Sequence, residues 1–143
     1  MQLLNALSVP RALATFARKW LKASCLATDT VGDCVYISAD YSGIRYSVTR
    51  ADPRDTLKMP AVGIIISKSS PTLCKVQWSG ELVGVYTGLT LNKPIFVGQD
   101  GRVTITPPGP LTGGYSFVQN LGVIVGSNRI LLAPNFFMVK RVG

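Results

Sequence analysis

The chain has 143 residues, 47% of them hydrophobic and 15% charged, which predicts one folded domain with a substantial core and excludes a chain disordered over most of its length. No apolar run approaches the roughly 20 residues of a membrane-spanning helix. The net charge is +8, and all seven acids lie between Asp29 and Asp100, so both ends of the chain are basic and favour an acidic partner. The basic residues form no stripe interleaved with aromatics, so direct binding to nucleic acid is not expected.

Residues 1–28 differ from the rest of the chain, because they are rich in Ala and Leu, basic, and free of glycine and acids. From residue 11 to residue 24 apolar side chains recur at helical spacing, which predicts a short amphipathic helix. Pro10 and Ser8 stand near its start, where a helix accepts a proline and a cap. The residues expected to bind a partner from this arm are Arg11, Phe16, Arg18, Lys19, Trp20 and Lys22.

Three interpretations of this predicted helix stay open. It packs on its own β-domain with Phe16 and Trp20 in the core, or it docks as an arm on a neighbouring subunit or partner, or it is a membrane-surface helix or organelle-targeting peptide. We take the arm as the working hypothesis, since the segment precedes the β-domain as a compositionally distinct extension. A secretory signal is disfavoured, because basic residues interrupt the stretch where a continuous apolar core is required.

From Thr30 onward the sequence pattern is typical of short β-strands separated by turns. We expect strands at 34–38, 44–49, 60–67, 72–78, 82–86, 95–97, 103–106, 115–118, 121–125 and 129–133. The polar stretch 50–59 is predicted to be a surface loop, and 107–114 an irregular loop. Closely spaced short strands are typical of an all-β protein, here a small β-barrel or β-sandwich of antiparallel strands with the helical arm at its N-terminus.

One stretch, 88–108, predicts a β-hairpin with particular clarity. Its apolar run 95–97 precedes the turn Gln99-Asp100-Gly101, and alternating residues follow from Val103 to two prolines. Val103 and Ile105 are expected on one buried face.

The sequence offers little reactive chemistry. Histidine is absent, which removes Ser-His-Asp and Cys-His catalysis and most zinc sites. Three cysteines form no C-x-x-C pair and are predicted to be buried thiols, and Cys74 in particular to be a core thiol. The acids mostly stand at turns, where capping of the local backbone is their expected role, and Asp52 and Asp55 are expected to pair with nearby Arg50, Arg54 and Lys58. We therefore expect no catalytic residue, no cofactor and no metal.

Five segments follow one another in a recognisable order. They read VGDCVYISAD, SVTRADPRDTLKMPAVGIIISK, TLCKVQWSGEL, GLTLNKPIFVGQDGRVTITPP and LGVIVGSNRILLAP, and they cover residues 31–134. This order resembles the β-domain of small structural proteins from tailed bacteriophages, a group associated with capsid decoration (cement) proteins and virion fibres, often as trimers. The resemblance implies a noncatalytic part of the virion.

Together these observations predict an arm at 1–28, a β-barrel or sandwich domain at 29–134 and a C-terminal tail at 135–143. The expected function is capsid decoration, with the major capsid protein as partner, a homotrimer favoured, no membrane contact, and the capsid surface as location. The alternative is a fibre, tail or adaptor component that binds a receptor or sugar through loops 50–59 and 107–114.

Overall fold

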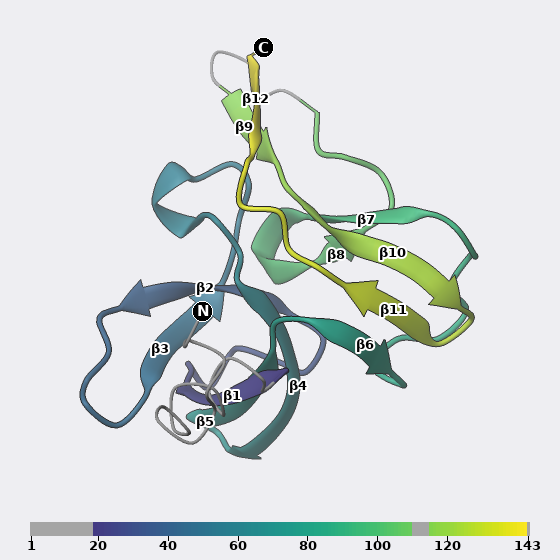
Figure 1. Cartoon of the computed structure of the whole chain (residues 1–143). Coiled ribbons are helices and arrows are strands. Elements are labelled where there is room, and N and C mark those ends of the chain that lie inside the picture. Colours follow the sequence, from purple (N-terminus) through teal and green to yellow (C-terminus); the bar gives the residue numbers. More distant parts are fainter. Residues whose placement is uncertain (1–18, 110–114, 143) are drawn as a thin grey trace, which may run out of the picture.

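The computed structural model describes residues 19–109 and 115–142. This part of the chain consists of short strands and two single-turn 3-10 helices, η2 (Thr56–Lys58) and η3 (Gln99–Gly101), so the all-β prediction is confirmed (Figure 1). The strands are β1 (Trp20–Ser24), β2 (Cys34–Ala39), β3 (Tyr46–Arg50), β4 (Gly63–Ser70), β5 (Leu73–Gln77), β6 (Gly80–Val83), β7 (Pro94–Val97), β8 (Val103–Thr104), β9 (Tyr115–Val118), β10 (Asn120–Gly126), β11 (Arg129–Leu132) and β12 (Val139–Val142).

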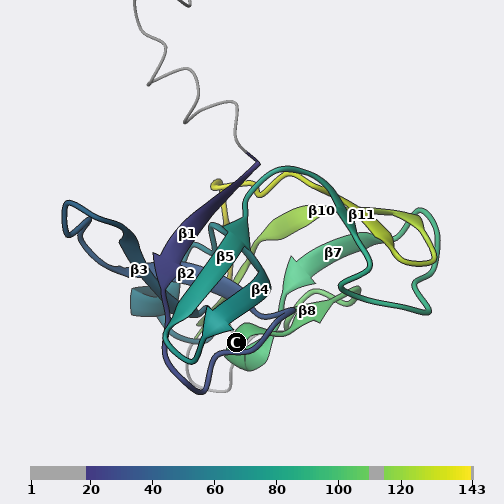
Figure 2. The same ribbon diagram turned by 90° about the horizontal axis from the view of Figure 1, so that it is seen from below.

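Five strands close into a barrel in the order β1-β3-β2-β4-β5. β2 and β3 form the hairpin that the alternating sequence predicted, and β4 and β5 form a second one. β1 closes the barrel, since it pairs antiparallel with β5 along its whole length and parallel with β3 at its end. Figure 2 shows β1, β5 and β4 side by side on one side of the molecule.

The helix predicted for 11–24 is wrong over Trp20–Ser24, because these residues are β1. Leu21 and Ala23 face the barrel interior while Lys22 is exposed, so the segment follows the strand period of two. Its partner β5 lies about 50 residues later in the chain, and the sequence pattern around β1 does not predict so distant a pairing. The β-structure thus starts before residue 29, and the predicted arm residues Arg11, Phe16 and Arg18 lie outside the described residues.

A second sheet has the order β6-β11-β10-β7-β8 and lies beside the barrel (Figures 1 and 2). It contains the predicted hairpin, in which β7 pairs with β8 around the turn η3. Asp100 and Gly101 both have positive φ, 51° and 77°, as this tight turn requires. β8 is shorter than predicted and ends at Thr104, so Ile105 is exposed rather than buried beside Val103.

Two apolar cores hold these layers together. The smaller one fills the barrel and includes Val35, Val48, Ile65 and Val76. The larger one joins the barrel to the second sheet, and its buried members are Cys34, Ala51, Ala61, Ile64, Leu82, Ile95, Val97, Leu121, Ile124, Ile130 and Leu132. The shared core makes the barrel and the second sheet one packed unit.

The C-terminal segment, predicted to be a tail, ends in a strand. β12 pairs antiparallel with β9 to form a separate two-stranded ribbon, and this ribbon projects away from the barrel and the second sheet at the top of Figure 1. The backbone N–H of Phe117 in β9 donates to the carbonyl of Pro53 at 2.8 Å. The base of the ribbon is therefore attached to the loop that follows β3.

Candidate functional site

The described part of the predicted arm lies in the barrel wall. Trp20 is half-buried, and the Lys75 ammonium lies 3.8 Å from the centre of its ring, within cation–π distance. Lys22 stands directly opposite Lys75 across the β1–β5 pair. Trp20 therefore contributes to the barrel surface with Lys75, a residue that the sequence did not single out.

We define the basic strip as Lys22 and Lys75, which stand opposite each other on β1 and β5. Lys19 is not part of it, because its side chain lies against Gly80. Like charges placed directly opposite on neighbouring strands repel each other, so an anionic group at this position would be favoured. Lys68 of β4 is not part of the strip, because its ammonium donates to the carbonyls of Leu26 and Asp29. The strip is suited to an acidic partner surface.

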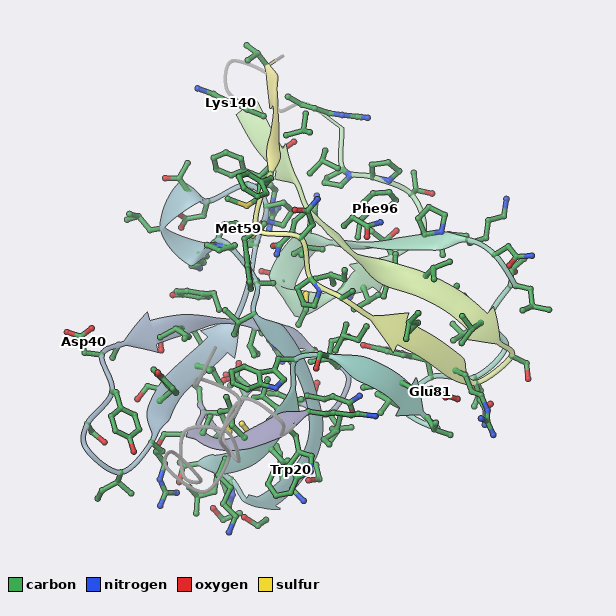
Figure 3. The ribbon with its side chains drawn as sticks, viewed as in Figure 1. Trp20, Asp40, Met59, Glu81, Phe96 and Lys140 are labelled. Atoms are coloured by element: carbon green, nitrogen blue, oxygen red, sulfur yellow. The ribbon has the colours of Figure 1, made fainter. Side chains whose placement is uncertain are left out.

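A second candidate surface is the β9–β12 ribbon. Phe137, Val139 and Val142 are 91%, 61% and 72% exposed, and Lys140 and Arg141 between them are exposed as well. Figure 3 shows Lys140 at the ribbon end of the molecule and Trp20 at the far end of the barrel. The ribbon and the basic strip thus lie at opposite ends of the described structure.

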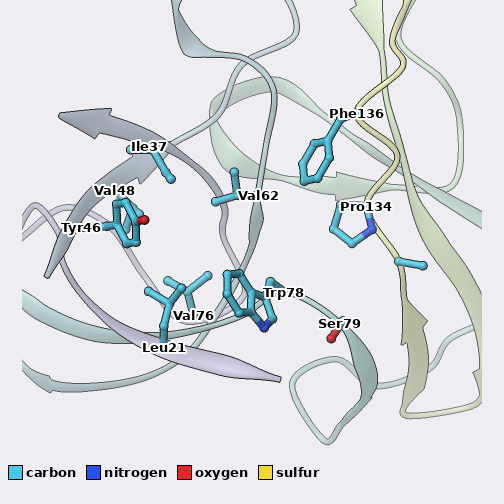
Figure 4. Close-up of a pocket in the computed structure, with 11 residues that line it drawn as sticks. Leu21, Ile37, Tyr46, Val48, Val62, Val76, Trp78, Ser79, Pro134 and Phe136 are labelled. Carbon is cyan, nitrogen blue, oxygen red and sulfur yellow. The ribbon is translucent and has the colours of Figure 1, made fainter. Parts of the chain in front are cut away.

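A third feature is an apolar pocket of about 500 Å³ between the barrel and the segment that follows β11 (Figure 4). Its walls come from β1, β2, β3, β5, the residues flanking β4 and β6, and residues 133–136. The lining residues are Leu21, Ile37, Tyr46, Val48, Val62, Val76, Trp78, Ser79, Ala133, Pro134 and Phe136. No carboxylate or ammonium group is among them, so the pocket is suited to apolar groups.

The acids mostly act as predicted, as caps of turns. Carboxylates of Asp29, Asp33, Asp52 and Asp55 each accept a hydrogen bond from a backbone N–H two or three residues away, at 2.8–3.0 Å. Glu81 instead pairs with Arg129 across β6 and β11 at 2.6 Å. These carboxylates are engaged in structural contacts and form no acid–base pair.

The predicted local ion pairing in 50–59 is correct for Arg54 and wrong for Arg50. Arg54 donates to Asp52 at 2.6 Å, whereas Arg50 donates to Asp33 at 2.8 Å, since antiparallel pairing of β2 and β3 brings their ends together. The stretch is also less exposed than a surface loop, because Asp52 and Pro53 are buried.

The buried carboxylate of Asp52 organises this loop and the η3 turn. It accepts hydrogen bonds from the Arg54 side chain and from the backbone N–H groups of Arg54 and Asp100, at 3.0 and 3.3 Å for the two backbone groups. Burial by itself would raise the pKa of Asp52, but these hydrogen bonds and the Arg54 charge outweigh it and lower the pKa from 3.8 to about 2.

Because the pKa of Asp52 is lower in the folded chain than in the unfolded chain, its carboxylate stabilises the fold above about pH 4, and this contribution is lost as the pH falls from about 4 to about 2. We expect Asp52→Asn to lower the free energy of unfolding by about 1–2 kcal/mol at pH 7, and the difference from the wild type to shrink toward zero near pH 2. Urea denaturation across this pH range measures both curves. Asp40→Asn, at an exposed turn, is the control and should cost less than about 0.5 kcal/mol. If the free energies of unfolding of the wild type and Asp52→Asn differed by the same amount at every pH, the lowered pKa of Asp52 would be contradicted.

The cysteines are free and buried, as predicted. Burial and the neighbouring Asp33 raise the pKa of the Cys34 thiol to about 12, and burial also raises the pKa of Cys74 to about 12. Thiols with such pKa values are poor nucleophiles at neutral pH. Within residues 19–109 and 115–142, no group of three or more Cys, Asp or Glu side chains could hold a metal ion.

Comparisons with protein-family models, with curated proteins and with solved structures find no match for the chain. In the described ranges, no helix has the length and hydropathy needed to cross a bilayer. The candidate functional surfaces are accordingly the basic strip, the ribbon and the apolar pocket. The sequence analysis named Lys22 but not Lys75, and it missed the pocket, because the lining residues are scattered from Leu21 to Phe136.

Proposed function

We propose that the protein is a non-enzymatic part of a phage virion, a capsid decoration (cement) protein that binds the lattice of the major capsid protein and stabilises the head. The five segments that resemble phage structural proteins support this proposal. The observation that carries it is the β9–β12 ribbon, which presents apolar and basic side chains to solvent far from the barrel. Exposed apolar surface of this kind marks a face that another molecule covers.

The ribbon also supports self-association into a homotrimer. A two-stranded ribbon is marginally stable alone, and in the described residues β9 and β12 pair only with each other. No described strand pairs with the outer edge of β12, whereas the outer edge of β9 is bonded to the loop after β3 through Phe117, so a neighbouring copy could add to the ribbon at β12. A closed ring of three copies would bury Val139 and Val142 in equivalent contacts.

The basic strip would then face the capsid. Lys22 and Lys75 lie on β1 and β5 with Trp20, which Figure 3 shows at the end of the molecule away from Lys140. Arg11 and Arg18 precede Lys22 in the sequence. An acidic capsid surface would neutralise these charges and relieve the repulsion between Lys22 and Lys75. Many copies on one lattice would add avidity to each weak contact.

The test compares Val139→Glu/Val142→Glu with the wild type. We expect the double variant to lose the trimer mass in light scattering and to bind empty capsids at least tenfold more weakly, because two carboxylates would enter the subunit contact. The matched control is Leu91→Glu, the same kind of exchange at an exposed apolar residue before β7. If the double variant keeps the wild-type mass and co-sedimentation, the ribbon is not the contact.

Binding assays with the purified protein distinguish capsid decoration from the alternative role as a fibre, tail or adaptor component. Charge reversal at Lys22 and Lys75 should weaken capsid binding and leave the trimer mass unchanged. Binding to glycans that is lost on changing loop 50–59, with no capsid binding, would instead favour a receptor-binding role.

A further inference from the structure

The proposed function leaves the apolar pocket without a role. Val48 and Val76 at its base are buried, while Ile37, Tyr46 and Phe136 at its mouth are exposed. Figure 4 shows Pro134 and Phe136 facing Ile37 and Val48 across the opening, with Trp78 between them. A volume of about 500 Å³ lies within the roughly 300–1,000 Å³ of pockets that enclose a ligand.

The described chain begins at the rim of this pocket. The carbonyl of Lys19 accepts a hydrogen bond from the backbone N–H of Trp78 at 2.8 Å, and the Lys19 side chain lies against Gly80. Trp78 and Ser79 line the pocket, and Leu21, two residues after Lys19, does so too. Residues 1–18 therefore connect to the fold beside the opening.

The composition of residues 1–18 is complementary to the pocket. Leu13 and Phe16 are apolar and stand only six and three residues before Lys19, a span of at most about 20 Å for Leu13 and about 10 Å for Phe16 in an extended chain. So short a connection gives these side chains a high effective concentration at the pocket. Arg11 and Arg18 would find no acidic partner among the lining residues, so they would stay outside.

We propose that the pocket binds the apolar side chains of residues 1–18 of the same chain, with Phe16 and Leu13 inserted and Arg11 and Arg18 held outside near Lys19 and Lys22. The apolar side of this amphipathic segment then serves to fix it, and its basic side extends the basic strip. The inference does not depend on capsid binding, because the pocket and the segment belong to one chain.

A photo-crosslinking amino acid at position 16 of the full-length protein tests the proposal. A mixture of isotopically light and heavy copies shows whether each cross-link lies within one copy or joins two. We expect cross-links to peptides that contain Trp78 and Ser79, or Pro134 and Phe136, always with matching labels. The same reagent at exposed Leu57 in η2 is the control and should not reach these peptides.

A second measurement uses Trp78 fluorescence in a Trp20→Phe background. Phe16→Asp should expose the pocket and shift the emission to longer wavelength, whereas Thr15→Asp, which adds the same charge one residue earlier, should not. Cross-links that join light and heavy copies would assign the pocket to a neighbouring copy and overturn the proposal. No cross-link at the pocket, or an unchanged Phe16→Asp spectrum, would overturn it as well.

Discussion

Gly122→Ala is expected to lower the free energy of unfolding by about 3 kcal/mol or more. Gly122 lies in β10 between β7 and β11, and its φ of 147° is in the region that favours glycine. A Cβ atom there would lie 2.0 Å from the carbonyl oxygen of Leu131 on β11, so the two strands would have to separate. Because Leu121 and Ile124 on either side belong to the larger core, this separation would also loosen the contact with the barrel.

The control for Gly122→Ala is Gly126→Ala in the same strand. A Cβ atom at Gly126 would meet only side-chain carbons of Arg129, the nearest being its Cβ at 3.3 Å, so a shift of a few tenths of an ångström would make room for it. We expect a change below about 1 kcal/mol for the control, measured by urea denaturation under the same conditions. Equal effects of the two substitutions would show that the Leu131 carbonyl does not limit the space at Gly122.

Substitution of Gln119 is also expected to lower the free energy of unfolding strongly. Gln119 is a fully buried polar residue between β9 and β10. Its side-chain carbonyl accepts from the N–H of Ala61, and its NH₂ group donates to the carbonyl of Ala61, both at 2.8 Å. The amide thus takes the place of a neighbouring strand for Ala61, which precedes β4 of the barrel. Gln119→Leu leaves both backbone groups of Ala61 buried without a partner, and we expect a loss of about 2–4 kcal/mol.

Two further variants make the Gln119 prediction specific. Gln99→Leu places the same substitution at an exposed glutamine of η3 and should cost less than about 0.5 kcal/mol. Gln119→Glu keeps the acceptor for the Ala61 N–H but, once ionised, has no donor for the Ala61 carbonyl. Its stability deficit should therefore grow as the pH rises above about 4. A small effect of Gln119→Leu at every pH would contradict the proposed contact.

Local patterns in the sequence were sufficient for the hairpins. Gln99-Asp100-Gly101 predicted the turn between β7 and β8, because few residues other than glycine and aspartate adopt the positive φ that it needs. Alternation predicted the β2–β3 hairpin, and the run of β-branched residues around Ile64 predicted a buried strand. In each of these segments the information lies in one strand or in two strands that follow each other directly in the chain.

β1 shows where local patterns are insufficient. The apolar and polar residues of Trp20–Ser24 fit the pattern of an amphipathic helix and that of a half-buried strand about equally well. Five residues are too few to distinguish the helical period of 3.6 residues from the strand period of two. Pairing with β5 stabilises the strand conformation, because the backbone of β1 forms hydrogen bonds with β5 and Ala23 is buried in the barrel. The prediction of a helix reaching residue 24 could not include this pairing.

Residue type and short spacing are enough to predict the all-β class, the turn positions, the capping role of most acids and the basic charge of both chain ends. The folded chain adds four features that these local patterns do not contain: β1 closes the barrel, Gln119 binds the backbone of Ala61, Lys22 stands opposite Lys75, and residues from Leu21 to Phe136 enclose one apolar pocket. Each of these features joins residues far apart in the chain, and such contacts depend on how the strands pair and pack rather than on any neighbouring residue.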